Sequence, residues 1–361
     1  MRKKLDKLEA IRGFAAVYVV LHHTYYQLID RSWWTFIFEF GQEAVILFFI
    51  LSGFVIQYSF SLSKDQSFKT YFFKRFNRIY IPLLLVFIAN YLILYLQGDS
   101  TTIDGKNLAG NLFMLQDIPY KPNVFCRPFL GNDPLWSLSY EWWFYMIYFF
   151  VFYYFRKNIS NVIYILGIIG AISYIFYPFW GNRIFMYMII WNVGADLAKI
   201  YLANGSIKFN DLYKQFSVLF VCVLLLALNF YLNKDSVHAL LHREGTTGFG
   251  MGISPALEFR HFFFTIVALG IGILWYRLKW PMFNFSIGLF EKFAPISYCF
   301  YISHWFLISR ATYLSFINNV FLRYALYFVI CIVFSYLVER IIYVKINGYI
   351  VKLLKKNTIA Q

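Results

Sequence analysis

Charged residues are scarce in this chain of 361 residues. They make up 14% of it, while apolar residues reach 60% and aromatic residues 23%. An ordinary soluble domain has about 25% charged and about 45–50% apolar residues. The shortage of charge argues against a soluble globular protein, and the excess of apolar residues predicts a protein that crosses a membrane several times.

Cysteine is also rare, and acidic residues are fewer than basic ones. Cys126, Cys222, Cys299 and Cys331 do not show the spacing of metal ligands, so neither a metal site nor a disulfide framework is predicted. The net charge of +15 is typical of nucleic-acid-binding proteins. However, the basic residues form short clusters between apolar runs, as in cytoplasmic loops of membrane proteins, so we expect no nucleic-acid partner.

The apolar runs are continuous and suit membrane helices, which need about 20 residues each. With a cytoplasmic N-terminus, 23 of the 33 basic residues fall on the inner side, which favours an even number of spans and two cytoplasmic termini. The predicted fold is an all-α integral membrane protein, a bundle of about ten transmembrane helices in a single domain over 1–361. A short basic cytoplasmic tail is expected at 344–361. The expected spans are 12–30, 38–60, 79–96, 136–155, 161–178, 184–202, 215–232, 261–276, 294–310 and 322–343.

The basic N-terminus and the long loops raise two further questions. No small-residue cleavage site follows the first apolar run, so we expect an uncleaved first span rather than a signal peptide. Long outer loops are expected at 97–135 and 233–260. The second contains the run GTTGFGMG, which only superficially resembles a phosphate-binding loop because it follows no strand; we expect a flexible loop.

The first span begins RGFAAVYVVLHH, residues 12–23, and so carries histidines deep in the membrane. Arg12 and His23 are eleven residues apart, which is within about 20° of three full turns, so both lie on one helix face. The rise between them is roughly 16 Å, which places His23 near the bilayer midplane. An ionisable group there predicts a functional site, and neutral histidine is a common general base. The alternative is a histidine that hydrogen-bonds a neighbouring helix.

Two arginines in the second loop suggest an anion site. Arg75 and Arg78 lie in FFKRFNRIYIP, residues 72–82, on one face of a short helix expected at the cytoplasmic surface. Paired guanidinium groups suit bidentate binding of phosphate. Anchoring to anionic lipid is the competing explanation.

Other polar residues also fall inside predicted spans. Glu43 lies near the outer end of the second span, and Glu141 lies among tryptophans whose presence an aromatic belt explains. The belt does not explain the carboxylate. His304 is about ten residues from the inner end of the ninth span, so we expect it at the same depth as His23.

Two features are predicted to be structural. Ser52 and Gly53, in the second span, are small residues that favour close helix packing. Glu339 and Arg340 end the last span, where local charge pairing and anchoring explain them.

Five segments, in order along the chain, resemble the motifs of membrane-bound acyltransferase family 3. They cover most of the chain, and their joint occurrence is more specific than any one of them. The chain departs from the family pattern after the late histidine, which is followed by Trp305 and Phe306 and by no proline. It resembles the stand-alone members, which have no C-terminal esterase-like domain. The matching segments are Arg12 with His23, FFILSGF at 48–54, Arg75 with Arg78, WSLSYE at 136–141 and ISYCFYISHW at 296–305.

The resemblance implies transfer of an acyl group, expected to be acetyl, from acetyl-CoA or another acyl-CoA to a hydroxyl of a cell-envelope saccharide. The implied partners are acyl-CoA, a glycan or lipid-linked saccharide, and membrane lipid, in the inner (plasma) membrane of a bacterium, with no metal. The implied roles are catalysis by His23, Arg12 and Glu141, donor binding by Arg75, Arg78 and Arg12, and acceptor binding by Glu43, Trp136, Ser139 and His304.

A transporter or lipid-handling protein is the alternative function. In that case His23, His304 and Glu141 would form a path for protons or substrate. Transporters often show inverted repeats and helices broken at matching places, and this sequence shows neither. The enzyme is therefore the preferred hypothesis.

Overall fold

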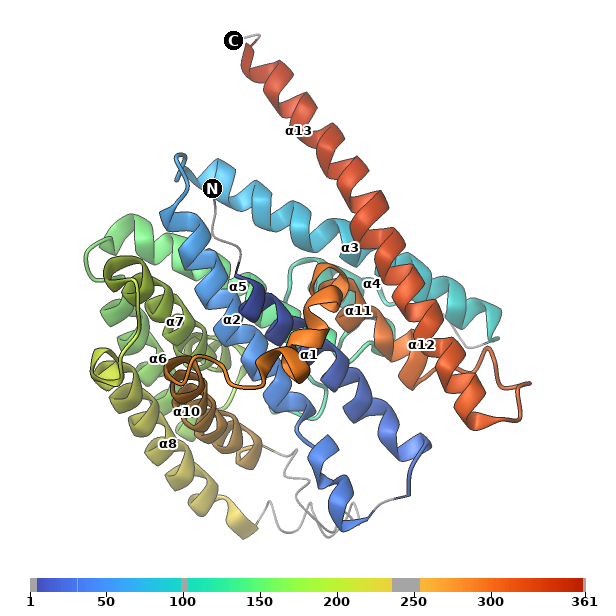
Figure 1. Ribbon diagram of the computed structural model, residues 1–361, viewed down its shortest axis with the longest axis horizontal. Helices are drawn as coiled ribbons and strands as arrows, with labels where there is room; N and C mark the ends of the chain where they lie inside the picture. Colours follow the sequence, from blue (N-terminus) through green and yellow to red (C-terminus); the bar gives the residue numbers. More distant parts are fainter. Residues whose placement is uncertain (1–4, 31, 99–102, 236–253, 360–361) are drawn as a thin grey trace.

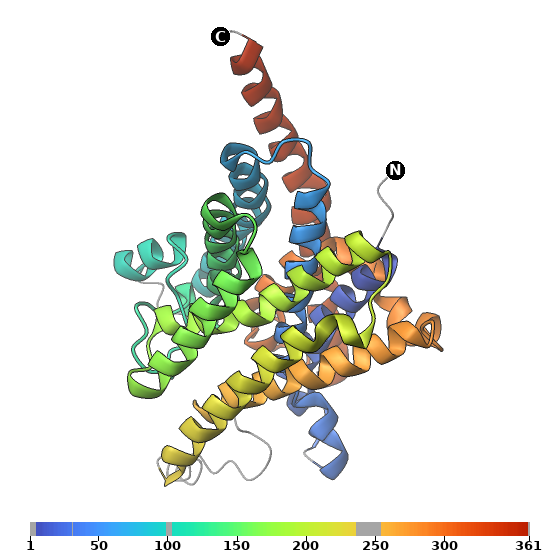
Figure 2. The same ribbon diagram turned by 90° about the vertical axis from the view of Figure 1, so that its left-hand side faces the viewer.

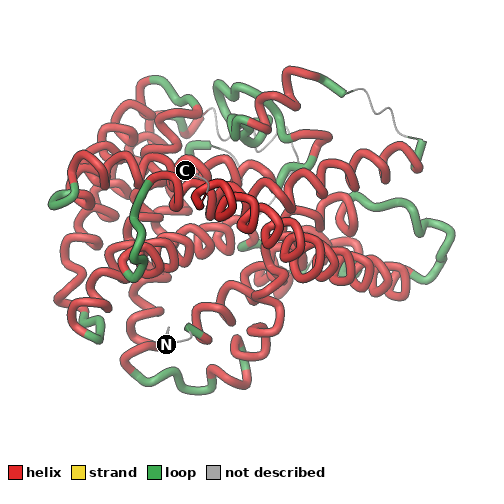
Figure 3. The backbone as a smooth tube through the Cα atoms, turned by 90° about the horizontal axis from the view of Figure 1, so that it is seen from above, coloured by secondary structure: helices red, strands yellow, loops and turns green. Residues whose placement is uncertain are grey.

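The computed structural model confirms an all-helical architecture for the part of the chain that it describes (Figure 3). Within this part the only extended pairing is an isolated bridge between Gln116 and Cys126. The glycine-rich run GTTGFGMG lies outside the described residues. The described residues are 5–30, 32–98, 103–235 and 254–359.

A helix forms at each predicted span, because long apolar runs without interruption favour helix over other structures. Short 3₁₀ turns join several of them. The helices are α1 (Asp6–Thr24), α2 (Gly41–Ser61), α3 (Phe68–Leu96), α4 (Gly105–Leu112), α5 (Leu135–Phe155), α6 (Ile159–Phe176), α7 (Trp180–Asn204), α8 (Tyr213–Leu232), α10 (Ala256–Arg277), α11 (Ser297–His304), α12 (Val320–Tyr336) and α13 (Tyr343–Ile359).

Six segments of the described chain are long and apolar enough to cross a membrane. Of the other predicted spans, α1 and α7 carry several charged or amide side chains. In α7, for example, Arg183, Asn192 and Asp196 are buried. A helix surrounded by other helices can carry polar groups that lipid would not tolerate. The number of ten spans and the cytoplasmic termini stay predictions. The six segments are Trp33–Ser61, Phe68–Leu96, Ile159–Phe176, Phe209–Leu232, Ala256–Arg277 and Val320–Lys352.

Helices α1 and α2 lie at the centre of the bundle, with α6, α7, α8 and α10 on one side and α3 and α12 on the other (Figure 1). Helices α2 and α7 approach each other through reciprocal glycines. A methyl group on Gly53 would collide with the carbonyl of Trp191, and one on Gly194 would collide with the carbonyl of Ile50. The predicted close packing at Gly53 is thus confirmed.

Three segments differ from the sequence-based expectation. Arg75 and Arg78 belong to the first half of the long helix α3, not to a separate short helix, because Pro82 does not end it. Membrane helices tolerate such a proline where neighbouring groups satisfy the backbone. The predicted span 294–310 is divided into a 3₁₀ segment that contains Pro295, the short helix α11 and a π-helical turn.

The end of the chain is the third difference. Helix α12 continues through a π-helical turn at Leu337–Ile342 into α13, so the predicted tail is helical as far as Ile359. Figures 1 and 2 show that α13 extends away from the rest of the bundle. The π-helical turn places Glu339 toward the interior, where its side chain is buried.

Candidate active site

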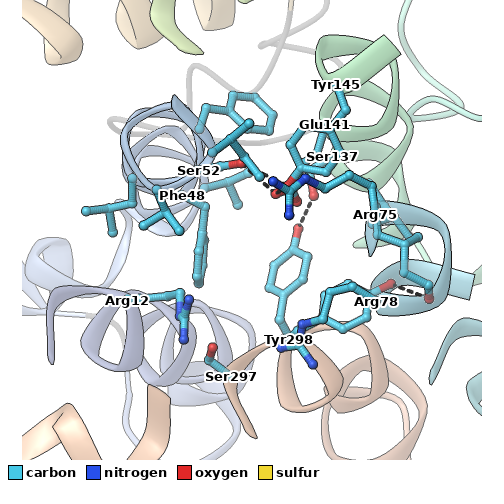
Figure 4. A pocket seen from close by; sticks show the side chains of 18 of the residues that line it. Arg12, Phe48, Ser52, Arg75, Arg78, Ser137, Glu141, Tyr145, Ser297 and Tyr298 are labelled. Atoms are coloured by element: carbon cyan, nitrogen blue, oxygen red, sulfur yellow. Dashed lines mark hydrogen bonds between the residues drawn. The ribbon is translucent and has the colours of Figure 1, made fainter. Parts of the chain in front are cut away.

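A cavity of about 300 Å³ lies between α1, α2, α3, α5 and α11 (Figure 4). We call it the arginine cavity. Arg12 enters it from α1, while Arg75 and Arg78 enter from α3 on the opposite side. The structure thus brings together the three arginines predicted to bind the donor. The polar residues that line the cavity are Glu9, Arg12, Ser52, Arg75, Arg78, Ser137, Glu141, Tyr145, Ser297, Tyr298 and Tyr301.

Two of the three arginines already have a carboxylate partner. Arg12 pairs with Glu9, one turn earlier in α1, at 2.5 Å and also donates to the carbonyl oxygen of Ala294 at 3.2 Å. Arg78 forms an ion pair with Glu339. Their positive charges are therefore partly neutralised before any substrate binds.

Arg75 is different, because no described residue forms an ion pair with it. Its guanidinium lies over the rings of Tyr71 and Tyr145, 5.2 and 5.8 Å from their centroids, and is 3.4 Å from the Ser59 hydroxyl. Its Nε is buried and has no hydrogen-bond partner among the described residues. Arg75 is therefore the arginine of the cavity best suited to bind an anion.

Glu339 holds Arg78 from a distant part of the chain. Both of its carboxylate oxygens face the Arg78 guanidinium, and one also accepts the backbone N–H of Cys299 at 2.9 Å. The expectation that Glu339 pairs locally was wrong, because the π-helical turn directs the side chain toward α3 and α11 rather than toward Arg340.

Glu141 lies in the arginine cavity and is held by two hydroxyl groups. Ser52 donates to its Oε1 at 2.8 Å, and Tyr145 donates to the same oxygen. Trp191 in turn donates to the Ser52 hydroxyl at 3.2 Å. Ser52 was predicted only to allow close packing of helices. In the structure its hydroxyl also makes a hydrogen bond to Glu141, which lines the arginine cavity. Glu141 does not line the cavity that contains His23.

A second, smaller cavity of about 80 Å³ contains His23. We call it the histidine cavity. It lies where α1 ends and α2 begins, beside the loop that precedes α5. Of the residues predicted to bind the acceptor, Trp136 lines it. The full lining is Val19, His23, Gly41, Gln42, Val45, Ile118, Tyr120, Asp133, Pro134, Trp136, Tyr301 and Trp305.

His23 stacks on His304, as expected if both lie at one depth. The ring centroids are 5.4 Å apart, and the Trp305 ring stands perpendicular to His23 at 5.0 Å. The Nδ1 of His304 is 2.5 Å from the carbonyl oxygen of Tyr301. Because a carbonyl oxygen only accepts, this nitrogen carries the proton and Nε2 is the acceptor. Nε2 is buried and has no partner among the described residues.

Ser139 and Glu43 line neither cavity. The Ser139 hydroxyl is buried, with the carbonyl oxygens of Gln116 at 2.7 Å and Trp136 at 2.9 Å. Glu43 is buried and forms an ion pair with Arg260 of α10. These contacts account for both polar groups as supports of the surrounding structure.

A buried ionic cluster that was not predicted from the sequence lies near the histidine cavity. Asp117 lies 2.9 Å from Arg183 and 3.3 Å from Lys121, and all three side chains are fully buried. Lys121 also lies 4.3 Å from the ring centroid of Trp136. The cluster ties the loop before α5 to α7 and so positions the lining residue Trp136. In the sequence, Arg183 stands one residue before the predicted span 184–202, and Asp117 and Lys121 fall in a predicted outer loop, so no pattern joined the three.

Comparisons with known proteins identify the family of the chain. The sequence profile of an acyltransferase domain matches residues 5–340. A curated relative, acyltransferase MdmB of Streptomyces mycarofaciens, is 31% identical over 162 residues, which is 43% of this chain and 41% of the relative. The match thus spans less than half of that protein.

No solved structure matches the chain. The profile includes all residues of both cavities, which favours an enzyme over the transporter considered above. This chain therefore belongs to acyltransferase family 3 and is a transferase of acyl groups.

Proposed function

We propose that this protein is an integral-membrane O-acyltransferase that moves an acetyl group from acetyl-CoA to a hydroxyl of a cell-envelope saccharide in the plasma membrane of a bacterium. The observation that carries this proposal is the position of α1 between the two cavities. Arg12, near its beginning, lines the arginine cavity, and His23, near its end, lines the histidine cavity. Helix α1 thus joins the arginine cavity, which suits an anionic donor, to His23, which can act as a base.

The arginine cavity suits the donor. Coenzyme A carries several phosphates, and Arg75 offers a guanidinium that no described carboxylate neutralises. With a cytoplasmic N-terminus, as the basic residues predict, this cavity faces the compartment that contains acyl-CoA. The narrow pantetheine arm would extend from Arg75 along α1 toward His23.

The histidine cavity suits the acceptor. Its lining combines aromatic rings with a few polar groups, which is the usual composition of a small-molecule site. Tyr120, Trp136 and Trp305 present rings that can face a sugar, while Gln42 and Asp133 can hydrogen-bond its hydroxyls.

The chemistry assigns His23 as general base. It removes the proton from the acceptor hydroxyl, whose oxygen attacks the thioester carbonyl carbon. A carbon–oxygen bond forms, the carbon–sulfur bond breaks, and the leaving thiolate takes the proton from His23. His304 provides a second ring beside the base, which restricts its orientation.

Binding of labelled acetyl-CoA to the detergent-purified protein tests this proposal without knowledge of the acceptor. We expect saturable binding that Arg75→Ala abolishes. Arg156→Ala is the matched control, because Arg156 is exposed and lines neither cavity. Absence of binding by the unaltered protein, with acetyl-CoA and with longer acyl-CoAs, would overturn the proposal.

A further inference from the structure

The arginine cavity and the histidine cavity meet at two side chains. Val45 of α2 and Tyr301 of α11 are the residues that line both cavities. Both side chains are buried. They belong to two different helices and lie at the boundary between the cavity of the arginines and the cavity of His23.

Tyr301 is held firmly in this position. Its hydroxyl donates to the carbonyl oxygen of Pro134 at 3.0 Å and lies 2.8 Å from the hydroxyl of Ser137. Its ring lies 5.7 Å from that of Phe48. Its carbonyl accepts the Nδ1–H of His304, so the same residue also fixes the ring that stacks on His23.

We propose that Val45 and Tyr301 form a partition that determines which acyl groups the enzyme accepts. The inference rests on the proposed function, since it assumes that the donor occupies the arginine cavity. The acyl carbon must pass between these two side chains to reach a hydroxyl beside His23. The space beyond them is about 80 Å³, against about 300 Å³ on the arginine side.

The consequence is selection for a short acyl chain. A rigid apolar site discriminates one methylene group by roughly 10- to 200-fold. Because Tyr301 is anchored at its hydroxyl and Val45 is β-branched, neither can easily move aside for a longer chain. The structure therefore assigns acyl-length selectivity to this pair rather than to the arginines, which contact the donor elsewhere.

The test compares the affinities of acetyl-CoA and butyryl-CoA, measured by displacement of labelled acetyl-CoA from the purified protein. In the unaltered protein we expect butyryl-CoA to bind at least 10-fold more weakly. In Val45→Ala the ratio of the two dissociation constants should approach one. Tyr301→Phe, which keeps the ring but loses the anchoring hydroxyl, should change the ratio in the same direction by a smaller factor.

Val86→Ala is the matched control, because Val86 is also a buried valine but lines neither cavity. It should leave the ratio unchanged. If both acyl-CoAs bind and Val45→Ala leaves their ratio unchanged, the partition is refuted while the proposed function stands. If the unaltered protein binds neither acyl-CoA, the proposed function fails and the partition fails with it.

Discussion

The imidazole rings of His23 and His304 stack with their centroids 5.4 Å apart, one at the end of α1 and the other at the end of α11. His304 is fully buried, while His23 lines the histidine cavity. The contact between His304 and the carbonyl oxygen of Tyr301 places the proton of the His304 ring on Nδ1. The buried histidine therefore supports the histidine that is accessible, and the two should respond differently to substitution.

Replacing His23 should remove the base without removing the donor site. We expect His23→Ala to lower acetyl transfer by roughly 10²- to 10⁴-fold, the usual contribution of a general base. Binding of labelled acetyl-CoA should persist, because Arg75 is unchanged. Transfer at the original rate by a correctly inserted His23→Ala protein would refute the assigned role.

His304 should act through the orientation of His23. His304→Asn keeps a donor near the Tyr301 carbonyl but removes the ring and its unpaired Nε2. We expect transfer to fall by roughly 10-fold, as for the loss of one hydrogen bond or ring contact, with an unchanged dissociation constant for acetyl-CoA. A change confined to that dissociation constant would instead place His304 in the donor site.

Arg78 should be more important for stability than Arg75. Arg78→Ala leaves the buried carboxylate of Glu339 without its ion-pair partner, and we expect a loss of about 1–3 kcal/mol because Arg78 itself is partly exposed. The paired change Arg78→Met with Glu339→Leu should recover much of this loss, since apolar residues often replace a buried ion pair without net cost. Unfolding by denaturant in detergent measures the difference.

The control for this experiment is Arg340→Ala. Arg340 is exposed, so the substitution should change the free energy of unfolding by less than about 0.5 kcal/mol. Equal stability of Arg78→Ala and the unaltered protein would contradict the structural role of the pair. For the same reason, Arg75→Ala by itself is a cleaner test of donor binding than a variant that also lacks Arg78.

The reciprocal glycines should not tolerate a methyl group. Gly194→Ala and Gly53→Ala each place a Cβ against a backbone carbonyl of the facing helix, and we expect a loss of about 1–3 kcal/mol. Gly270→Ala in α10 is the matched control, because nothing lies within 4 Å of its added Cβ. Alanine there should raise stability by up to about 1 kcal/mol, since it favours helix over glycine. Equal thermal stability of all three variants would exclude close packing of α2 on α7.

Much of the fold followed from local sequence, but several contacts of the site did not. The helices follow from long apolar runs, and the common depth of His23 and His304 follows from helical rise. The pairing of Arg78 with Glu339 and the contact of Ser52 with Glu141 join helices that are distant in sequence. Helical periodicity defines the face on which a residue lies, but not the helix that the face meets.

Hydropathy and helical geometry act over one or two turns, so local sequence is enough to specify an all-helical membrane protein with arginines and histidines at characteristic spacing. Which of these groups are available to a ligand depends on the tertiary structure. It neutralises Arg12 and Arg78 with carboxylates and leaves Arg75 without an ion pair among the described residues. The charge at a site depends on every helix that meets there, and this is a property of packing rather than of any single segment.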